Sequence, residues 1–206
     1  DAGGSGGAVA LQQLSGEDDP SGFLQCNFTS NTARVQLNVK DSETITAPST
    51  GGGGAIAAAV VSNGMRLESC VLVGNSATHA AGGAVNIQTS RYLLVSFTAA
   101  IRNCAGSNGG GVLISIMASA TSSWMPKNSF EQNTAGLATG GNSGLGGMGG
   151  AIFAETSTIA TTCSSFIGNA AIRGGAIYAR LQARIAMLGE QDLSDCTARA
   201  TLAAVS

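Results

Sequence analysis

Two short motifs alternate along this chain and recur too regularly for an ordinary globular fold. One is Gly-Gly followed by Ala and a β-branched residue; the other is an apolar residue, two variable residues, Asn, a small residue and Ala. Self-similarity at a period of about 20–50 residues is the signature of a solenoid, in which each repeat forms one coil of a stack. The Gly-Gly motif occurs at Gly6–Val9, Gly53–Ile56, Gly82–Val85, Gly110–Val112 in shortened form, Gly149–Ile152 and Gly174–Ile177.

Alternation of apolar and polar residues after each Gly-Gly pair indicates strands. Val85 and Ile87, for example, share one face and Asn86 lies on the other, which is the period of a β-strand. Further apolar segments at 65–68, 92–97 and 183–188 predict about three strands per coil, with a helical turn as the alternative for 183–188. The expected fold is all-β: a right-handed parallel β-helix of the pectin-lyase type, with about six coils.

Each copy of the second motif places an Asn at a turn. Asn tolerates the left-handed backbone of a sharp turn, and identical side chains in coils about 4.8 Å apart form ladders. We therefore expect one hydrogen-bonded Asn column along the stack. It comprises Asn31, Asn75, Asn103, Asn133 and Asn169, and a degenerate last copy has Cys196 instead.

The spacing between successive motif asparagines varies, and the excess falls at one place in the coil. It lies in residues 32–52 and in the Gly-rich residues 136–148, both between the Asn turn and the Gly-Gly pair. A solenoid tolerates insertions at one corner because neighbouring coils keep their register. We predict a single β-helix domain over residues 1–206 with these two corner insertions, as a segment of a longer protein.

Charge and hydropathy restrict the partners. Charged residues make up 11% of the chain, the net charge is -2, and Lys and Arg form no run. Phosphate binding needs clustered cations, so nucleic acid is not an expected partner. The longest apolar stretch, Ala55–Val61, is shorter than the about 20 residues that cross a bilayer. No direct membrane span is therefore expected in this segment.

Cys26 and Cys70 each lie five residues before the Asn of their coil. In adjacent coils they would stack about 4.8 Å apart, within the Cα range of a disulfide. The sequence predicts a Cys26–Cys70 disulfide, with a pair of buried thiols as an equal alternative. Cys104, Cys163 and Cys196 occupy unmatched offsets, so one of them stays unpaired or bonds outside this segment.

Asn27-Phe28-Thr29 is an N-glycosylation sequon. If Phe28 points into the core, alternation along the strand places the Asn27 side chain in solvent. Asn27 is therefore a candidate glycosylation site in a secreted protein.

No residues have the pattern of a catalytic, cofactor or metal site. The isolated acids Glu68, Glu131 and Glu155 fall at different coil positions, and His79 is the only histidine. Sugar hydrolysis needs paired carboxylates, and one His with scattered Cys cannot form a triad or a zinc centre. We expect no catalytic residue, cofactor or metal. Two acidic clusters are interpreted as solvated: Glu17-Asp18-Asp19, and Glu190 with Asp192 and Asp195.

The alternation of Gly-Gly-Ala-Ile with Phe-x-x-Asn resembles the repeats of the polymorphic outer membrane proteins of chlamydiae. Similar repeats occur in algal and protist surface proteins. The resemblance extends from Gly6 to Ala198. It implies a β-helical, surface-exposed module with an adhesive or structural role, and it supplies no catalytic residue.

These observations favour a non-catalytic extracellular or cell-surface structural or adhesion module. The expected partners are other protein subunits or surface glycans. A subunit of a larger assembly or filament is a related hypothesis, because the ends of a parallel stack expose unpaired backbone. The alternative is a carbohydrate-active β-helix enzyme, a polysaccharide lyase or glycoside hydrolase, with two acids within about 10 Å in one groove. Trp124 is expected to pack a corner; an exposed Trp124 would favour carbohydrate binding.

Overall fold

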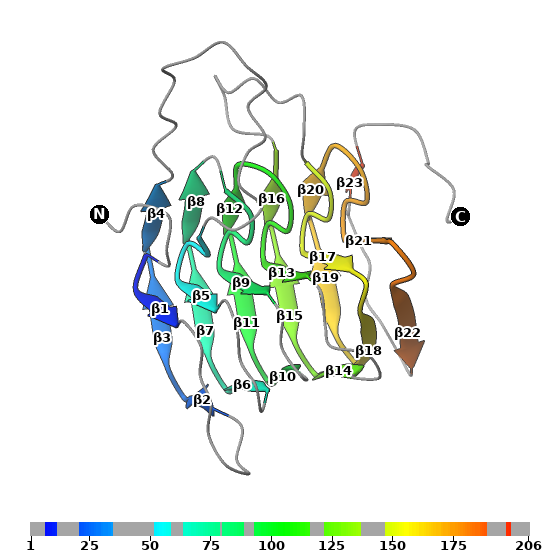
Figure 1. Ribbon diagram of the computed structural model, residues 1–206, viewed down its shortest axis with the longest axis horizontal. Helices are drawn as coiled ribbons and strands as arrows, with labels where there is room; N and C mark the ends of the chain where they lie inside the picture. The colour runs from blue at the N-terminus through cyan, green and yellow to red at the C-terminus, as the bar shows by residue number, and fades with distance from the viewer. Residues whose placement is uncertain are drawn as a thin grey trace.

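The computed structural model describes residues 7–11, 21–34, 52–58, 64–78, 80–88, 93–115, 122–136, 147–188 and 197–198. Within these residues the chain forms short strands and no helix, and the strands of successive coils pair in parallel. Figure 1 shows the coils stacked side by side, with the first strands at one end and the last strands at the other. The predicted parallel β-helix is confirmed.

Strands at equivalent positions in successive coils form four parallel sheets. The first sheet follows the Gly-Gly pairs and contains β1 (Val9–Leu11), β5 (Ile56–Ala58), β9 (Val85–Gln88), β13 (Val112–Ser115), β17 (Ile152–Glu155) and β21 (Ile177–Arg180). The second sheet contains β2 (Ser21–Leu24), β6 (Met65–Glu68), β10 (Leu93–Ser96), β14 (Ser122–Pro126), β18 (Thr158–Thr162) and β22 (Arg184–Leu188).

The Asn turn separates the third sheet from the fourth. The third sheet contains β3 (Asn27–Thr29), β7 (Val71–Val73), β11 (Ala99–Ile101), β15 (Ser129–Glu131) and β19 (Ser165–Ile167). The fourth contains β4 (Thr32–Arg34), β8 (Ser76–Thr78), β12 (Cys104–Ala105), β16 (Thr134–Ala135), β20 (Ala170–Ala171) and β23 (Thr197–Ala198). Six strands in three of the sheets match the expected number of coils.

A full coil contains four strands, so the expectation of about three was wrong. The residue before each motif Asn adopts a positive φ, which interrupts the extended backbone and divides one segment between the third and fourth sheets. These residues are Ser30, Gly74, Arg102, Gln132 and Gly168.

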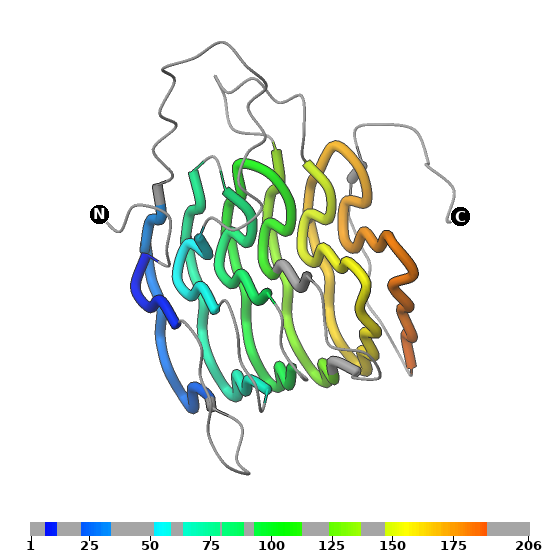
Figure 2. The backbone as a smooth tube through the Cα atoms, viewed as in Figure 1, coloured from blue at the N-terminus to red at the C-terminus, as the bar shows by residue number. Residues whose placement is uncertain are grey.

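Residues 35–51 and 137–146, within the two predicted insertions, lie outside the described residues. The margins of those insertions belong to the coils. Thr32–Arg34 form β4, and the N–H groups of Gly136 and Gly147 donate to the carbonyls of Ala105 and Ser107. Figure 2 shows how the tube winds from coil to coil past this corner.

Apolar side chains form layers inside the stack because each lies over its counterpart in the next coil. Phe130 pairs with Phe166 in register, and the two rings stack with centroids 5.0 Å apart and planes 9° from parallel. Full burial of such a side chain contributes about 1.5–3 kcal/mol. The same buried position holds Phe28, Leu72 and Ala100 in the preceding coils.

The Gly-Gly pairs form a corner at which the backbones of successive coils touch. A Cβ on Gly83 would overlap the carbonyl oxygen of Gly110 and lie 2.7 Å from the backbone of Cys104. Val112 pairs with Val85, so Gly111 takes the place of the motif Ala and Gly109-Gly110 is the true pair in this coil. The copy described as shortened is therefore complete.

Replacing Gly83 by Ala should cost about 3 kcal/mol or more, because the added Cβ would overlap backbone atoms of the next coil, which have no room to move. The control is Gly74→Ala, where φ is +63° and space is open, so the expected cost is only the left-handed strain of about 1–2 kcal/mol. Urea unfolding followed by circular dichroism measures both. An equal loss of unfolding free energy in the two variants would contradict close packing at the Gly-Gly corner.

Candidate functional site

The motif asparagines lie in one column at the corner between the third and fourth sheets. The backbone N–H and Nδ2–H of Asn31 donate to Oδ1 of Asn75 at 3.0 and 2.9 Å. The same pair of bonds joins each Asn to the next along the column as far as Asn169. All members except Asn31 are fully buried, so the column is an internal polar spine.

Each buried Asn also ties itself to the third sheet of the preceding coil. Nδ2 of Asn75 donates to the carbonyl of Phe28, and Nδ2 of Asn103 to that of Leu72, both at 2.9 Å. Asn133 and Asn169 repeat this bond with Ala100 and Phe130. A buried polar group is costly unless it is paired, and these bonds keep the side chains of the column paired.

A second polar column runs along the corner between the second and third sheets, and the sequence analysis missed it. The N–H of Cys70 donates to Oγ1 of Thr98 at 3.3 Å, that of Thr98 to Oδ1 of Asn128 at 2.9 Å, and that of Asn128 to Oγ of Ser164 at 3.2 Å. We call Cys26, Cys70, Thr98, Asn128 and Ser164 the mixed polar column.

The sequence did not predict the mixed polar column because its members have different side chains. Every member lies five residues before a motif Asn, but only the two cysteines share a side chain. Each member follows a residue of positive φ, as the Asn column does, so both corners share one turn geometry. These preceding residues are Gln25, Ser69, Phe97, Lys127 and Cys163.

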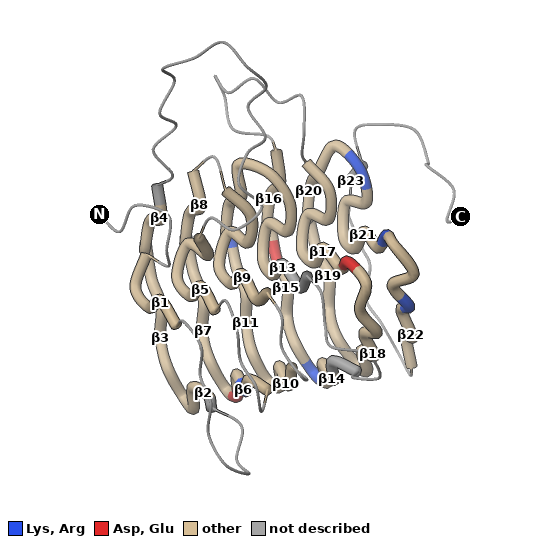
Figure 3. The backbone as a smooth tube through the Cα atoms, in the orientation of Figure 1, with Lys and Arg blue, Asp and Glu red and all other residues tan. Residues whose placement is uncertain are grey.

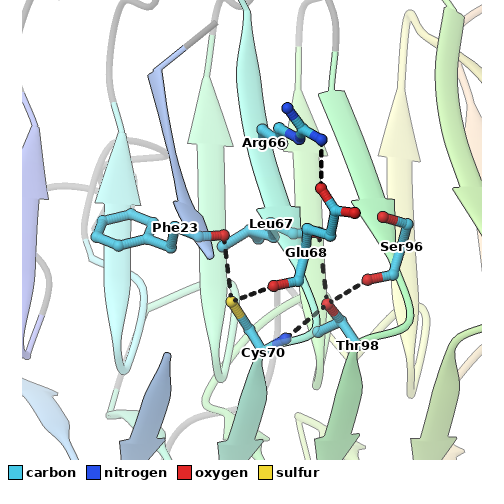
Figure 4. A network of polar contacts seen from close by, with 7 residues as sticks. All are labelled: Phe23, Arg66, Leu67, Glu68, Cys70, Ser96 and Thr98. Atoms are coloured by element: carbon cyan, nitrogen blue, oxygen red, sulfur yellow. Dashed lines mark hydrogen bonds and ion pairs between the residues drawn. The ribbon is translucent and has the colours of Figure 1, made fainter. Parts of the chain in front are cut away.

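Cys26 and Cys70 are neighbours at this corner, since the N–H of Val71 donates to the carbonyl of Cys26. Both are free thiols, so the predicted disulfide is not formed. Sγ of Cys70 donates to the carbonyls of Phe23 and Glu68, each at 3.4 Å (Figure 4), and Sγ of Cys26 donates to a carbonyl two residues earlier. Each thiol is therefore satisfied without a bond between the sulfur atoms.

The two thiols differ in their surroundings. Cys70 is fully buried, whereas Cys26 is half-buried. Burial raises the pKa of the Cys70 thiol because it disfavours the charged thiolate. Of the other cysteines, Cys104 is half-buried and Cys163 is exposed, and Cys196 lies outside the described residues.

The candidate glycosylation site is accessible. Asn27 is exposed at the start of β3, and Phe28 beside it is buried. The other residue of the sequon, Thr29, is also exposed.

The carboxylates considered for chemistry are separated by the fold. Glu68 lies on the second sheet and pairs with Arg66, whereas Glu155 lies on the first sheet and pairs with Arg180 at 3.0 Å. Glu131 lies on the third sheet and accepts a 2.6 Å hydrogen bond from the hydroxyl of the neighbouring serine. The structure therefore brings no two of these three acids together on one sheet.

Several residues considered in the sequence lie outside the described residues: His79, Glu17-Asp18-Asp19, and Glu190 with Asp192 and Asp195. In the part of the chain that is described, no group of three His, Cys, Asp or Glu side chains is placed to hold a metal ion. Nor does that part contain a helix long and apolar enough to cross a membrane.

Large apolar side chains are exposed on the outer side of the second and third sheets. On β22 of the last coil they include Met187 and Leu188, and in the first four coils they are Leu24 at 64%, Phe97 at 56%, Trp124 at 43% and Val71 at 37% exposure. We call the four residues of the first four coils the apolar face. The charged residues coloured in Figure 3 are few and spread along the backbone tube.

The two aromatic members of the apolar face are placed differently. Trp124 stands on β14, opposite Leu94 and Ala160 of the neighbouring coils, so it does not pack a corner as expected. Phe97 occupies a corner with a φ of 49°, a conformation unusual for a bulky side chain. The Lys127 ammonium lies 5.4 Å from the centre of the Phe97 ring.

Replacing Asn103 by Ala should lower the free energy of unfolding by about 3 kcal/mol. The N–H of Asn75 and the carbonyl of Leu72 would lose buried partners, at about 1–3 kcal/mol for each unpaired group. The matched control is Asn31→Ala, which removes only one bond at the half-buried end of the column and should cost about 1 kcal/mol. Urea unfolding compares the two variants, and equal costs would refute the role of burial.

In the folded protein at neutral pH, Cys70 should react with iodoacetamide at least about tenfold more slowly than Cys163. Cys70 is buried, and its raised pKa leaves less of the reactive thiolate. The difference in reaction rate between the two cysteines should therefore become smaller as the pH rises toward the pKa of Cys70. Peptide mass mapping measures the labelling. Equal rates, or a Cys26–Cys70 disulfide in a non-reducing map, would count against the satisfied-thiol arrangement.

Comparison with known families identifies the repeat. The model of the Chlamydia polymorphic membrane protein repeat matches residues 25–59 and 164–180. Each segment runs from the third sheet through an Asn of the column and a Gly-Gly corner to the first sheet. No curated protein and no solved structure shows a significant match to the chain. The chain therefore carries repeats of the Chlamydia polymorphic membrane protein type, at both ends of its β-helical stack.

Proposed function

We propose that the chain is a non-catalytic structural or adhesion module at the cell surface, which presents the apolar face to a partner. The observation that carries the proposal is the apolar face itself, with two exposed aromatic rings on one side of the stack. One exposed apolar side chain lies on each of the first four coils, and exposed apolar surface of this kind marks interaction sites where it is continuous. The repeat type is named for membrane proteins of Chlamydia, and this supports the surface location.

A rigid frame suits this role. The Asn column and the mixed polar column join consecutive coils at two of their corners. The side chains of the apolar face project from strands and turns that these bonds hold in place. Binding then costs less ordering entropy than it would on a mobile loop.

The chemistry of the apolar face suits a protein subunit or a surface glycan. Trp124 offers a broad ring of the type that dominates the energy of protein interfaces. The Phe97 ring lies beside the Lys127 ammonium, and the Arg66–Glu68 ion pair lies on the same sheet as Trp124. Apolar rings with charged groups nearby form the usual pattern of a core and a polar rim.

The enzyme alternative receives no support from the described carboxylates. Hydrolysis of a glycosidic bond uses two carboxyl groups that flank it. Glu68, Glu131 and Glu155 lie on three different sheets, and each is engaged by a neighbouring side chain. We therefore propose no catalytic role.

Replacing Trp124 by Ala, or Phe97 by Asn, should weaken binding of the fluorescently labelled chain to cells of its source organism. We expect a loss of about 5–30-fold for each variant, the effect of removing about 1–2 kcal/mol at an interface. Asn removes the Phe97 ring and tolerates the left-handed backbone, so the corner is preserved. Binding is measured by flow cytometry with competition from unlabelled protein.

The matched control is Leu181→Ala, which removes another exposed apolar side chain, at 61% exposure, from a turn of the last coil. Thermal unfolding must show that all variants are folded. Unchanged binding of both face variants, or an equal loss in the Leu181 variant, would reject the apolar face as the binding site.

A further inference from the structure

We propose that Trp124 is the centre of a binding site for a neutral glycan, which lies on the outer side of the second sheet with a sugar ring against the indole. The site rests on the proposed function, because it names the partner of the apolar face. Three observations support it: an exposed aromatic ring in the middle of a strand, uncharged residues beside it, and hydroxyl groups on the next strand.

Trp124 lies between neighbouring coils and not at an end of the stack. β14 pairs with β10 through Leu94 and with β18 along its whole length. Met125, the next residue, is fully buried in the core, whereas Trp124 is 43% exposed, because successive residues of a strand point to opposite faces. The exposure of the ring therefore follows from its position on the outer side of the sheet.

The strand that carries Trp124 is held to the next coil by side chains as well as by the sheet. The carbonyl of Met125 accepts hydrogen bonds from Oγ1 of Thr161 and Oγ of Ser164, both at 3.1 Å. Thr161 is fully buried, and Ser164 belongs to the mixed polar column. The indole therefore projects from a backbone that is ordered before a ligand arrives, which lowers the entropy cost of binding.

The described residues that adjoin Trp124 on the outer side are uncharged. Leu94 and Ala160 lie opposite it in the two neighbouring coils, and Pro126 lies two residues later on β14. All three are half-buried, and the Ala160 methyl is too short to cover an indole. Charged residues are few and spread along the backbone tube in Figure 3. A sulfated or carboxylated ligand would find no cluster of cations among them, so the surface favours a neutral ligand.

Hydroxyl groups lie on both sides of Ala160. Thr158 and Thr162 are half-buried and alternate with the buried Ile159 and Thr161 along β18, so they face outward together with Ala160. Two residues of strand separate each of these threonines from Ala160, a distance of about 7 Å. The position next to the Trp124 ring is therefore flanked by neutral groups that both donate and accept hydrogen bonds.

This combination suits a sugar better than a protein surface. One face of a pyranose ring carries C–H groups, which are weakly positive and pack against the negative face of an aromatic ring. The hydroxyl groups at the edge of the sugar then reach the hydroxyls of Thr158 and Thr162. A protein hot spot is instead surrounded by contacts that exclude water, whereas the exposed large apolar side chains of the first four coils occur at one per coil.

Titrated binding to an array of oligosaccharides tests the site. The array carries neutral oligosaccharides of glucose, galactose, mannose and N-acetylglucosamine together with sulfated ones, and the fluorescently labelled 206-residue chain should bind at least one neutral member. Trp124→Phe keeps an aromatic ring and should lose less than about fivefold in affinity. Trp124→Leu keeps apolar bulk without a ring and should lose at least about tenfold. Thr158→Val and Thr162→Val remove a hydroxyl at nearly constant shape and should each lose about 3–10-fold.

Intrinsic fluorescence locates the bound sugar. The chain contains one tryptophan, so its emission reports on Trp124 alone, and the neutral oligosaccharide that binds best on the array should change this emission in a saturable way. Thermal unfolding establishes that the variants are folded. The glycan site would be overturned by an absence of neutral ligands, by binding of sulfated ones alone, by an unchanged emission at saturation, or by a Trp124→Leu variant that binds like the unmodified chain.

Periodate treatment of cells of the source organism separates a failure of the glycan site from a failure of the proposed function. Mild periodate cleaves sugars that carry neighbouring hydroxyl groups and leaves polypeptide chains intact. It should lower binding of the unmodified chain to the level of Trp124→Leu on untreated cells. Binding that depends on Trp124 but survives periodate and is lost after protease treatment would overturn the glycan site and leave a protein partner for the apolar face. Binding that Trp124→Leu leaves unchanged on untreated cells would reject Trp124 as part of any binding site.

Discussion

The hydrogen bonds that each Asn of the column makes to the next coil hold the rest of the structure in place. At a corner the backbone turns, so its N–H and C=O groups cannot all pair as they do within a sheet. The side-chain amide of Asn103, for example, accepts from the N–H of Asn75 and donates to the carbonyl of Leu72. Unpaired, such buried groups would each cost about 1–3 kcal/mol. Corners held in this way keep every strand above its counterpart, and this alignment produces the apolar layers.

The same turn geometry places one side chain inside the stack and the side chain just before it on the surface. At both polar corners an inward side chain bonds to the neighbouring coil, and the residue just before it adopts a positive φ. The preceding residue points away from the core, so its identity is free to vary. At one corner the successive coils place Ser69, Phe97, Lys127 and Cys163 there. An exposed side chain such as Phe97 can therefore occupy this position without disturbing the column behind it.

The sides and the ends of the stack differ in the groups that they expose. A parallel coil pairs its backbone only along the stack axis, so the sides are covered by side chains and the ends by strand edges. The apolar face lies on one of these sides, where its side chains are exposed.

The sequence by itself determined the parallel β-helix, its number of coils and the Gly-Gly corner, because these follow from residue types that recur in every coil. Only the tertiary structure decided the features that depend on which atoms meet between coils. It divided each coil into four strands, revealed the mixed polar column behind unlike side chains, and left Cys26 and Cys70 as satisfied thiols. It also exposed Trp124. A repeat shows which positions are equivalent, whereas burial and hydrogen bonding depend on neighbours many residues away.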